Sequence, residues 1–454
     1  MEVIVIGAGQ AGSHIAQVLS QEKHSVTMID VDRNRLMHAE ENLDIRTICE
    51  HGANPQILEM AGVARADLVA AVTNSDEVNL IAAGTAKQLG AVRSAARVYN
   101  QAYHKSGKIE YRNLLNIDMI ISPQSITAFE IAKLIENPAA VAVESFAHEK
   151  VQMRQMMVPD DSSAAGKRIC DLFPPDRELE SLVVSLSRGT VMTIPGPEDV
   201  VCAGDRVTVI MPSGNARAVR RLFKDVEKGA ENVVIAGGGT TALMLAQIME
   251  SRGIAVTLIE GVRERCDALS RILSGTRIIH GDATRVSVLA EERVGDADVF
   301  VALCGNDEVN LMSSLQAKQM GVAHVVVAVN RADYAPLVER VGIDHAVSPR
   351  ILTGNRILTL AGGSNIRSMA LLQEGNAEVV ELTAEPNAPA VNRILGDELR
   401  FPKGVIIGAL VRGDKVLVPR GGDTILAGDT VIAFVLSEVL DELETLFQSP
   451  KWKN

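Results

Sequence analysis

Two glycine-rich runs carry residues that could hold a phosphate group. The first is VIVIGAGQAG, with Gly7, Gly9 and Gly12, and the second is VVIAGGGTTA, which starts at Val233. Each run follows an apolar, strand-like stretch and opens a stretch with helical spacing, so the N–H groups of a helix N-terminus would face a bound anion. The first glycine makes the turn, the second lets the backbone approach a pyrophosphate, and the third lets helix and strand pack closely.

An acidic residue follows each glycine run at the spacing of a dinucleotide site. Asp30 closes VTMID, 18 residues beyond Gly12, and Glu260 closes VTLIE. A carboxylate there accepts hydrogen bonds from an adenosine ribose and disfavours a 2′-phosphate, so NAD(H) or ATP/ADP is favoured over NADP. The alternative is that the glycines serve turn geometry only and the acids are solvated strand ends. This alternative has more weight in the second run, where Ala242 replaces the third glycine.

A polar loop follows the fourth predicted strand, at the edge of the sheet where ligands bind in doubly wound folds. Thr73 and Asn74 are its candidate binding residues. The same letters also fit a helix start, with Asn74 as N-cap and Glu77 three residues later, and the two interpretations are compatible. The second run has Cys304 and Gly305 there and lacks both polar side chains.

An arginine ends the next predicted strand of the first run. Arg97 lies in AARVYN, and an ungapped alignment places Ala328 opposite it in the second run. A lone arginine is commonly a surface ion-pair former, but at the edge of a phosphate site it is a candidate anion clamp. We therefore expect two unequal nucleotide sites, and we expect ligand binding at the first site to control regulation.

The sequence contains an internal duplication, the feature that organises the whole chain. Short matches recur in the same order, 224 to 231 residues apart: DEVNL at 76–80 and 307–311, AKQLG at 86–90 and AKQMG at 317–321, IDMIISP at 117–123 and IDHAVSP at 343–349, AGDRVTVI at 203–210 and AGDTVIAF at 427–434. Each copy first alternates apolar strands with helical stretches, which predicts a doubly wound parallel sheet. A part richer in Gly, Pro and Asp follows and predicts a small α+β lobe with hairpins.

The predicted fold class is therefore α/β, with two Rossmann-like doubly wound parallel sheets, each followed by a small α+β lobe. The predicted boundaries are 1–123 and 231–349 for the nucleotide-binding lobes, 124–149 and 350–377 for bridging helical segments, and 150–228 and 378–454 for the small lobes. The bridging stretches SITAFEIAKLI (125–135) and RILTGNRILTL (350–360) carry apolar stripes suited to packing across lobes.

Composition excludes several partners and places the chain in the cytoplasm. The formal charge is −12, from 45 basic and 57 acidic residues, which argues against nucleic acid and against direct binding to anionic lipid. No apolar run approaches the roughly 20 residues that a membrane helix needs, and the N-terminus has no signal-peptide pattern. Five cysteines without a Cys-x-x-Cys pair indicate reduced thiols.

The duplicated order of motifs resembles the RCK (regulator of K⁺ conductance) domain family over essentially the entire chain. The likeness is carried by two copies of GxG…D/E…DEVNL…ISP, each followed by an AGD hairpin lobe, and by GAGQAG, AVTNSDE, LIENPAAVAVESFA and GVIIGALVRGD. It implies a nucleotide-sensing regulatory subunit of a potassium uptake system, binding NAD(H) or ATP/ADP. Such a protein is peripheral on the cytoplasmic face of the inner membrane and gates an integral membrane K⁺-translocating subunit.

The resemblance also assigns nucleotide contacts residue by residue. In the first copy they fall on Gly7, Ala8, Gly9, Gln10, Ala11, Gly12, Asp30, Thr73, Asn74 and Arg97, and in the second copy on Gly237, Gly238, Gly239, Thr240, Thr241 and Glu260. The chain departs from the family pattern at Arg97-Val98-Tyr99, where Arg-x-Arg is common, and at GGGTTA, where GGGNIG is commoner.

Two other functions remain as alternatives. An NAD-dependent oxidoreductase would need a proton donor near the nicotinamide, but the nine histidines form no metal-type pair. His51 and His280 each precede a glycine, where capping a turn or bordering a ribose is expected rather than acid–base chemistry. We therefore expect no catalysis and no metal site. The second alternative is a gating module of a different cation carrier, since fold alone does not fix the partner. We expect a homo-oligomer, a tetramer.

Overall fold

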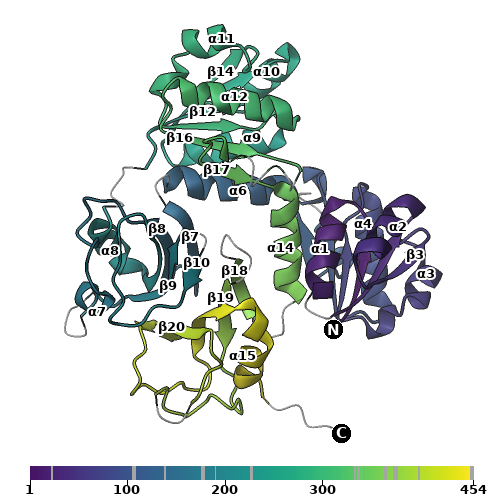
Figure 1. Ribbon diagram of the computed structural model, residues 1–454. Helices are drawn as coiled ribbons and strands as arrows, with labels where there is room; N and C mark the ends of the chain where they lie inside the picture. The colour runs from purple at the N-terminus through teal and green to yellow at the C-terminus, as the bar shows by residue number, and fades with distance from the viewer. Residues whose placement is uncertain are drawn as a thin grey trace. The chain divides into compact units, whose positions relative to one another are not determined.

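The computed structural model describes residues 1–21, 24–104, 109–137, 140–174, 179–189, 191–224, 229–331, 334, 338, 340–361, 366–371, 377–396 and 399–449. The chain divides into two compact units (Figure 1). The first unit comprises Met1–Glu136 with Ala230–Ala361, and the second comprises Asn137–Gly229 with Gly362–Asn454. Each unit therefore combines the corresponding parts of the two repeats.

The first parallel lobe is a six-stranded sheet in the order β3-β2-β1-β4-β5-β6, with every strand pair parallel. Its elements are β1 (Glu2–Ile6), α1 (Gln10–Gln21), β2 (Ser25–Asp30), α2 (Arg33–Asn42), β3 (Arg46–Cys49), α3 (Pro55–Met60), β4 (Leu68–Ala71), α4 (Asp76–Gln88), β5 (Arg93–Arg97), α5 (Tyr111–Leu114) and β6 (Met119–Ile121). The order reverses between β1 and β4, which is the crevice where doubly wound folds bind their ligands.

The second parallel lobe repeats this topology in the order β14-β13-β12-β15-β16-β17. Its elements are β12 (Asn232–Ala236), α9 (Thr240–Ser251), β13 (Ala255–Glu260), α10 (Arg263–Leu269), β14 (Thr276–His280), α11 (Val286–Glu291), β15 (Val299–Ala302), α12 (Asp307–Gln319), β16 (His324–Ala328) and β17 (His345–Val347). The central strands are almost entirely buried, as continuous apolar runs predict for a sheet covered on both faces. The predicted pair of Rossmann-like sheets is confirmed.

The helix that ends each parallel lobe packs on the other lobe. Helix α6 (Pro123–Glu136) buries its apolar stripe with α9, and α14 (Pro349–Ala361) buries Ile357 and Leu358 with Ile15 of α1. Figure 1 shows α14 alongside α1. A Cβ at Gly354 would lie 2.6 Å from His14 Cδ2, so glycine lets the two helices approach closely. The apolar stripes of the bridging segments thus pack across lobes, as their spacing predicted.

The second unit contains two antiparallel sheets, in the orders β10-β9-β11-β8-β7 and β18-β19-β22-β20-β21. Their elements are β7 (Ala140–Phe146), β8 (Val151–Met157), α7 (Ile169–Leu172), β9 (Leu182–Arg188), β10 (Val191–Thr193), β11 (Arg206–Pro212), α8 (Ala216–Leu222), β18 (Ile366–Leu371), β19 (Ala377–Thr383), β20 (Val405–Arg412), β21 (Lys415–Leu417), β22 (Thr430–Leu436) and α15 (Leu440–Phe447). The sheets share a buried cluster that includes Phe146, Ile210 and Phe434.

Two strands of these sheets lie in segments that the sequence analysis treated as helical bridges. Strand β7 falls within 124–149 and β18 within 350–377, and each pairs with the next strand of its sheet. The helical part of each bridge ends at Glu136 or Ala361. The valines of AVAVESF favour a strand over a continued helix.

Candidate nucleotide-binding sites

Both glycine loops make the strand–turn–helix geometry that the sequence predicted. Gly7 has a φ of +109° and Gly237 a φ of +98°, a region that residues with a side chain rarely adopt. Their N–H groups donate to Ile29 O at 2.7 Å and to Ile259 O at 2.8 Å, which fixes each loop to the neighbouring strand. A Cβ at Gly12 would lie 1.8 Å from Gly7 O, so the first loop requires glycine at that place.

The two acids end β2 and β13 and hold the glycine loops through their carboxylates. Asp30 Oδ2 accepts from Ala8 N at 2.6 Å, and its Oδ1 accepts from Asp32 N at 2.8 Å. Glu260 makes the same pair of contacts, with Gly238 N at 2.7 Å and Val262 N at 2.8 Å. The equivalent donors in the two lobes show that the acids are structural counterparts. Each carboxylate therefore borders the helix N-terminus, where an adenosine ribose and its phosphate would lie.

The acids differ in length, and the loop residue beside each acid differs to match. In the second lobe, a Cβ added at Gly238 would lie 2.8 Å from Glu260 Oε2 and 2.7 Å from Leu269 Cδ1. The longer glutamate thus occupies space that the first lobe gives to the methyl group of Ala8. The first lobe has Ala8 with Asp30, and the second has Gly238 with Glu260. Both pairs form the same hydrogen bond from the loop amide to the carboxylate, although the acids differ in length.

A buried asparagine organises the polar loop in each lobe. Asn79 is fully buried, accepts from Thr73 N at 2.7 Å, and donates from Nδ2 to Thr73 O at 2.9 Å and to Arg97 O at 2.8 Å. Asn310 makes the corresponding bonds to Cys304 N, Cys304 O and Ala328 O, at 2.7, 2.9 and 2.9 Å. The structure therefore places Ala328 at the position of Arg97. Neither asparagine was expected to organise its loop, although the unchanged DEVNL motif contains both.

The predicted N-cap of α4 is wrong by one residue. Ser75, and not Asn74, caps the helix, because its side chain accepts from Val78 N at 3.3 Å. Asn74 is exposed at the tip of the loop, whereas Thr73 is half-buried and its hydroxyl donates to Asn79 Oδ1 at 2.7 Å. The N–H groups of the first turn favour an oxygen acceptor, and the Ser75 hydroxyl lies closest along the chain. Asn74 is thereby left outside the capping geometry.

Arg97 lies against the polar loop at the end of β5. Its Nη2 donates to Thr73 O at 2.9 Å, and its guanidinium carbon lies 5.2 Å from the ring centre of Tyr99. Its Nε atom is buried and has no hydrogen-bond partner among the described residues. Burial lowers the pKa of Arg97, although an arginine stays protonated throughout the physiological range. A half-buried guanidinium with a spare donor at this edge is suited to an anionic ligand.

The second lobe has a different environment around its acid. Glu260 is 6% exposed, and Arg265 Nη1 lies 3.5 Å from its Oε2. Cys304 replaces Thr73, and burial raises the pKa of its thiol to about 11. The second site therefore offers a buried, ion-paired carboxylate and a protonated thiol, in place of the half-buried carboxylate and hydroxyl of the first.

The two histidines of the HG turns make local contacts. His51 Nδ1 accepts from Ala53 N at 3.3 Å, and a ring nitrogen of His280 lies 3.1 Å from Gly261 O. The His51 contact lies within its own turn and agrees with turn capping, one of the two roles expected for these histidines, whereas the His280 contact reaches the residue after β13. Within the described parts of the chain, no group of three or more His, Cys, Asp or Glu side chains is arranged to hold a metal ion.

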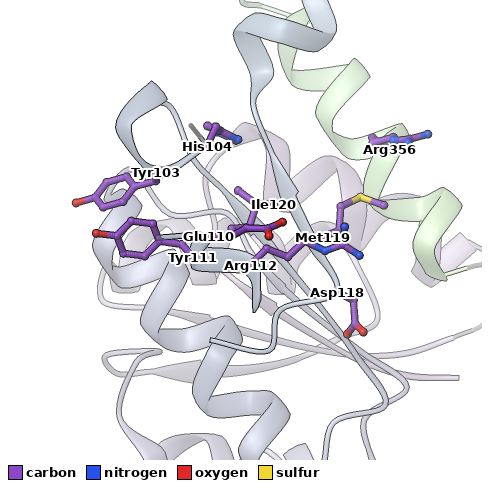
Figure 2. Close-up of a pocket in the computed structure, with 9 residues that line it drawn as sticks. All are labelled: Tyr103, His104, Glu110, Tyr111, Arg112, Asp118, Met119, Ile120 and Arg356. Atoms are coloured by element: carbon purple, nitrogen blue, oxygen red, sulfur yellow. The ribbon is translucent and has the colours of Figure 1, made fainter. Parts of the chain in front are cut away.

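A separate pocket of about 330 Å³ lies at the edge strand β6, with none of the predicted nucleotide contacts in its lining. Figure 2 shows Tyr103 and Tyr111 on one side and Arg356 of α14 on the other. Of its two acidic residues, Asp118 pairs with Lys87 at 3.0 Å, and Glu110 accepts from Asn113 Nδ2 at 2.6 Å. The pocket thus differs in place and chemistry from the glycine loops.

The topology defines a class of protein, one with two nucleotide-type Rossmann lobes and two small antiparallel lobes in tandem. Solved structures with this architecture include the GsuK channel, with a TM-score of 0.64 and 16% identity, covering 98% of this chain and 78% of that chain. The GsuK RCK domain matches with a TM-score of 0.61 and 16% identity, covering 98% and 94%. This likeness supports the RCK fold.

Sequence comparison then identifies the family. The TrkA-N domain family matches residues 3–123 and 233–349, and the TrkA-C domain family matches 153–224 and 379–448. A Trk system potassium uptake protein TrkA homolog of Methanosarcina mazei is 36% identical over 99% of this chain and 100% of its own length. The homolog of Archaeoglobus fulgidus is 37% identical with the same coverages, and the TrkA of Halomonas elongata is 35% identical over 99% of both. The chain belongs to the TrkA family of Trk potassium uptake proteins.

Proposed function

We propose that this protein is the nucleotide-sensing regulatory subunit of a Trk-type potassium uptake system. It binds an adenine nucleotide, NAD(H) or ATP/ADP, in the crevice beside Asp30 and gates a K⁺-translocating membrane subunit of the TrkH/TrkG type. The observation that carries the proposal is the bond between glycine loop and acid, which occurs in both lobes of a chain that belongs to the TrkA family. A structure described as the GsuK channel bound to NAD has the same fold, at 16% identity.

The proposed contacts divide the nucleotide between parts of the crevice. Asp30 receives the hydroxyl groups of the adenosine ribose, and the loop from Gly7 to Gly12 with the first turn of α1 holds the phosphates. Thr73, Asn74 and Arg97 border the phosphate end. In the second lobe, Gly237 to Thr241 and Glu260 form a weaker site without an arginine at the place of Arg97. The first site then makes the regulatory decision, because Arg97 responds to phosphate charge and Ala328 cannot.

Gating follows from differential affinity. A ligand shifts an equilibrium between two arrangements only as far as it binds one more tightly than the other. The helix that follows each parallel lobe packs on the other parallel lobe. A ligand bound at one glycine loop therefore lies in a lobe that also contacts a helix from the other repeat. We propose that ligand binding changes the packing of these helices, and that this change reaches the membrane partner.

The location and assembly follow from the same proposal. The protein is cytoplasmic, peripheral on the inner membrane through its partner, and a homotetramer. None of the helices in the described residues is both long and apolar enough to cross a bilayer. Light scattering in saturating nucleotide should give four chains per particle, and a monomer at micromolar concentration would contradict the assembly.

Titration calorimetry with ATP, ADP, NAD⁺ and NADH tests the proposal directly. We expect binding by the full chain and weakened binding of every adenosine ligand by Asp30→Ala, because the ribose loses its acceptor. NADH mixed with small carbonyl acids should show no consumption at 340 nm. Steady oxidation that is lost on substitution of one histidine would favour an oxidoreductase instead.

A further inference from the structure

The first turn of α14 reaches the nucleotide crevice of the first parallel lobe, although α14 belongs to the second repeat. Arg93 at the start of β5 donates from Nη1 to Leu360 O near the end of α14. From Leu360 back to Arg350 a helix spans about 15 Å. From Arg93 to Arg97 a strand spans about 13 Å. The start of α14 therefore lies level with the end of β5, at the edge of the sheet that carries the glycine loop.

Contacts along α1 agree with this direction. Gly354 packs against His14 and Ile15, and His14 Nε2 lies 3.4 Å from Asn355 Oδ1. The glycine loop is about one helical turn before His14, and Arg350 is one turn before Gly354. The N-terminal ends of α1 and α14 thus meet at the same edge of the sheet.

Within the described parts of the chain, two arginines of the crevice lack a carboxylate partner. Arg350 is half-buried and, among the described residues, makes no hydrogen bond or ion pair through its guanidinium. Burial is the main cause that lowers the pKa of Arg97, and the positive charge of Arg350 lowers it further. The nearby carboxylate of Asp76 is engaged by the amides of Tyr99 and Asn100, at 2.9 and 2.7 Å. Two half-buried guanidiniums that repel each other make a place where an anion is strongly favoured.

The second lobe serves as an internal comparison. Helix α6 starts Pro123-Gln124 where α14 starts Pro349-Arg350, so an uncharged glutamine takes the place of the arginine. Ala328 lies where the first lobe has Arg97. The matching edge of the second lobe therefore has neither arginine.

We propose that Arg350 of the second repeat and Arg97 of the first repeat together clamp the terminal phosphate of a nucleoside di- or triphosphate bound by the first lobe. The inference rests on the proposed function and goes beyond it, because it makes the first site a composite of both repeats. Guanidinium groups donate charge-assisted hydrogen bonds to phosphate oxygens, often two at a time. A ligand whose terminal phosphate reaches both arginines ties α14 to the first lobe, whereas a nucleoside monophosphate does not.

The test compares ATP, ADP and AMP by titration calorimetry on the full chain with Glu260→Ala, so that the first site dominates the signal. We expect Arg350→Gln to weaken ATP binding by roughly tenfold or more, and AMP binding by less than about twofold. Arg350→Lys keeps the charge and should retain part of the ATP affinity. The matched control is Arg356→Gln on the same helix, at the pocket of Figure 2, and it should bind ATP as the parent does. Thermal unfolding of each variant checks that the fold is intact.

Three results would overturn the clamp. Unchanged ATP affinity in Arg350→Gln excludes a phosphate contact. If Arg350→Gln weakens ATP and AMP binding equally, the substitution acts on the lobe as a whole. The same conclusion follows if Arg356→Gln weakens ATP binding as much as Arg350→Gln does. If the parent chain binds ATP and NAD⁺ normally in these cases, the proposed function stands without the clamp. If the parent binds no adenine nucleotide at all, both fail together.

Discussion

Glu260 and Arg265 form an ion pair in the second lobe, with 3.5 Å between Oε2 and Nη1. The matching arginine of the first lobe, Arg35, instead pairs with Asp32 at 3.3 Å. Asp32 is the N-cap of α2, and Val262 occupies its place in the second lobe without a side-chain cap. With Val262 in place of an aspartate, Arg265 has no capping carboxylate to pair with and contacts Glu260 instead. The second carboxylate has three partners, so it has less capacity left for a ribose.

Removing this ion pair should strengthen the second site. In Arg265→Ala, the carboxylate of Glu260 gains freedom to accept from a ribose hydroxyl. Because Arg265 is largely exposed, we expect a gain of about two- to fivefold in adenosine affinity. Calorimetry in an Asp30→Ala background isolates the second site. Arg263→Ala is the control, since Arg263 faces Asp267 at 3.8 Å. A loss of affinity in Arg265→Ala would mean that the arginine contacts the nucleotide itself.

The size match between Gly238 and Glu260 predicts that substitutions at these two positions have non-additive effects on stability. Gly238→Ala places a methyl group 2.8 Å from Glu260 Oε2, which must then leave its bond with the loop amide or shift. We expect a loss of roughly 1 kcal/mol in the free energy of unfolding, as for modest overpacking. Glu260→Asp shortens the acid and should recover most of this loss, because it recreates the pair Ala8 and Asp30. Denaturant unfolding of the two single variants and the double variant measures the coupling, and strict additivity would contradict the match.

Asn79 should be required for both the stability and the ligand response of the first lobe. Asn79→Ala leaves Thr73 N and Arg97 O without their buried partner, which we expect to cost about 2–4 kcal/mol. The loop that carries Thr73 would also lose its position beside Arg97. Asn310→Ala is the matched variant, with a similar loss of stability but a small effect on first-site binding. Equal effects of both variants on the ATP titration would argue against a special role of the first loop.

The second unit should lose stability in acid through Asp205. Hydrogen bonds from Arg188 Nε and Nη2, both 2.8 Å, lower the pKa of this buried carboxyl. Since the folded-state pKa lies below the unfolded value of about 3.9, the contribution is present above pH 4 and disappears as the pH falls further. Asp205→Asn should be less stable at pH 7 by about 1.5–3 kcal/mol, and the difference should shrink below pH 4. Thermal unfolding from pH 3 to 7 checks this, and a constant difference would contradict it.

The sequence predicted the elements that repeat and missed contacts that depend on packing. Asp30 and Glu260 could be placed because strand periodicity and glycine spacing are local patterns. The position of Arg350 beside the crevice could not, because it depends on which lobe the apolar stripe of α14 covers. Asn74 was chosen as N-cap because Glu77 three residues later matches a capping box, whereas Ser75, which caps the helix, has Val78 at that place. Arg265 was not singled out from the sequence, because its contact with Glu260 depends on the packing of a helix start that has Val262 in place of the capping Asp32.

The central claim is that the first nucleotide site controls potassium uptake. The most direct measurement is Rb⁺ uptake in cells that lack their own regulatory subunit and contain the cognate membrane partner, with this protein or its variants added back. The account predicts that uptake depends on the protein, that Asp30→Ala and Arg97→Ala abolish or blunt its response to the cellular nucleotide state, and that Glu260→Ala keeps most of it. Loss of the response in Glu260→Ala together with an intact response in Arg97→Ala would contradict the account.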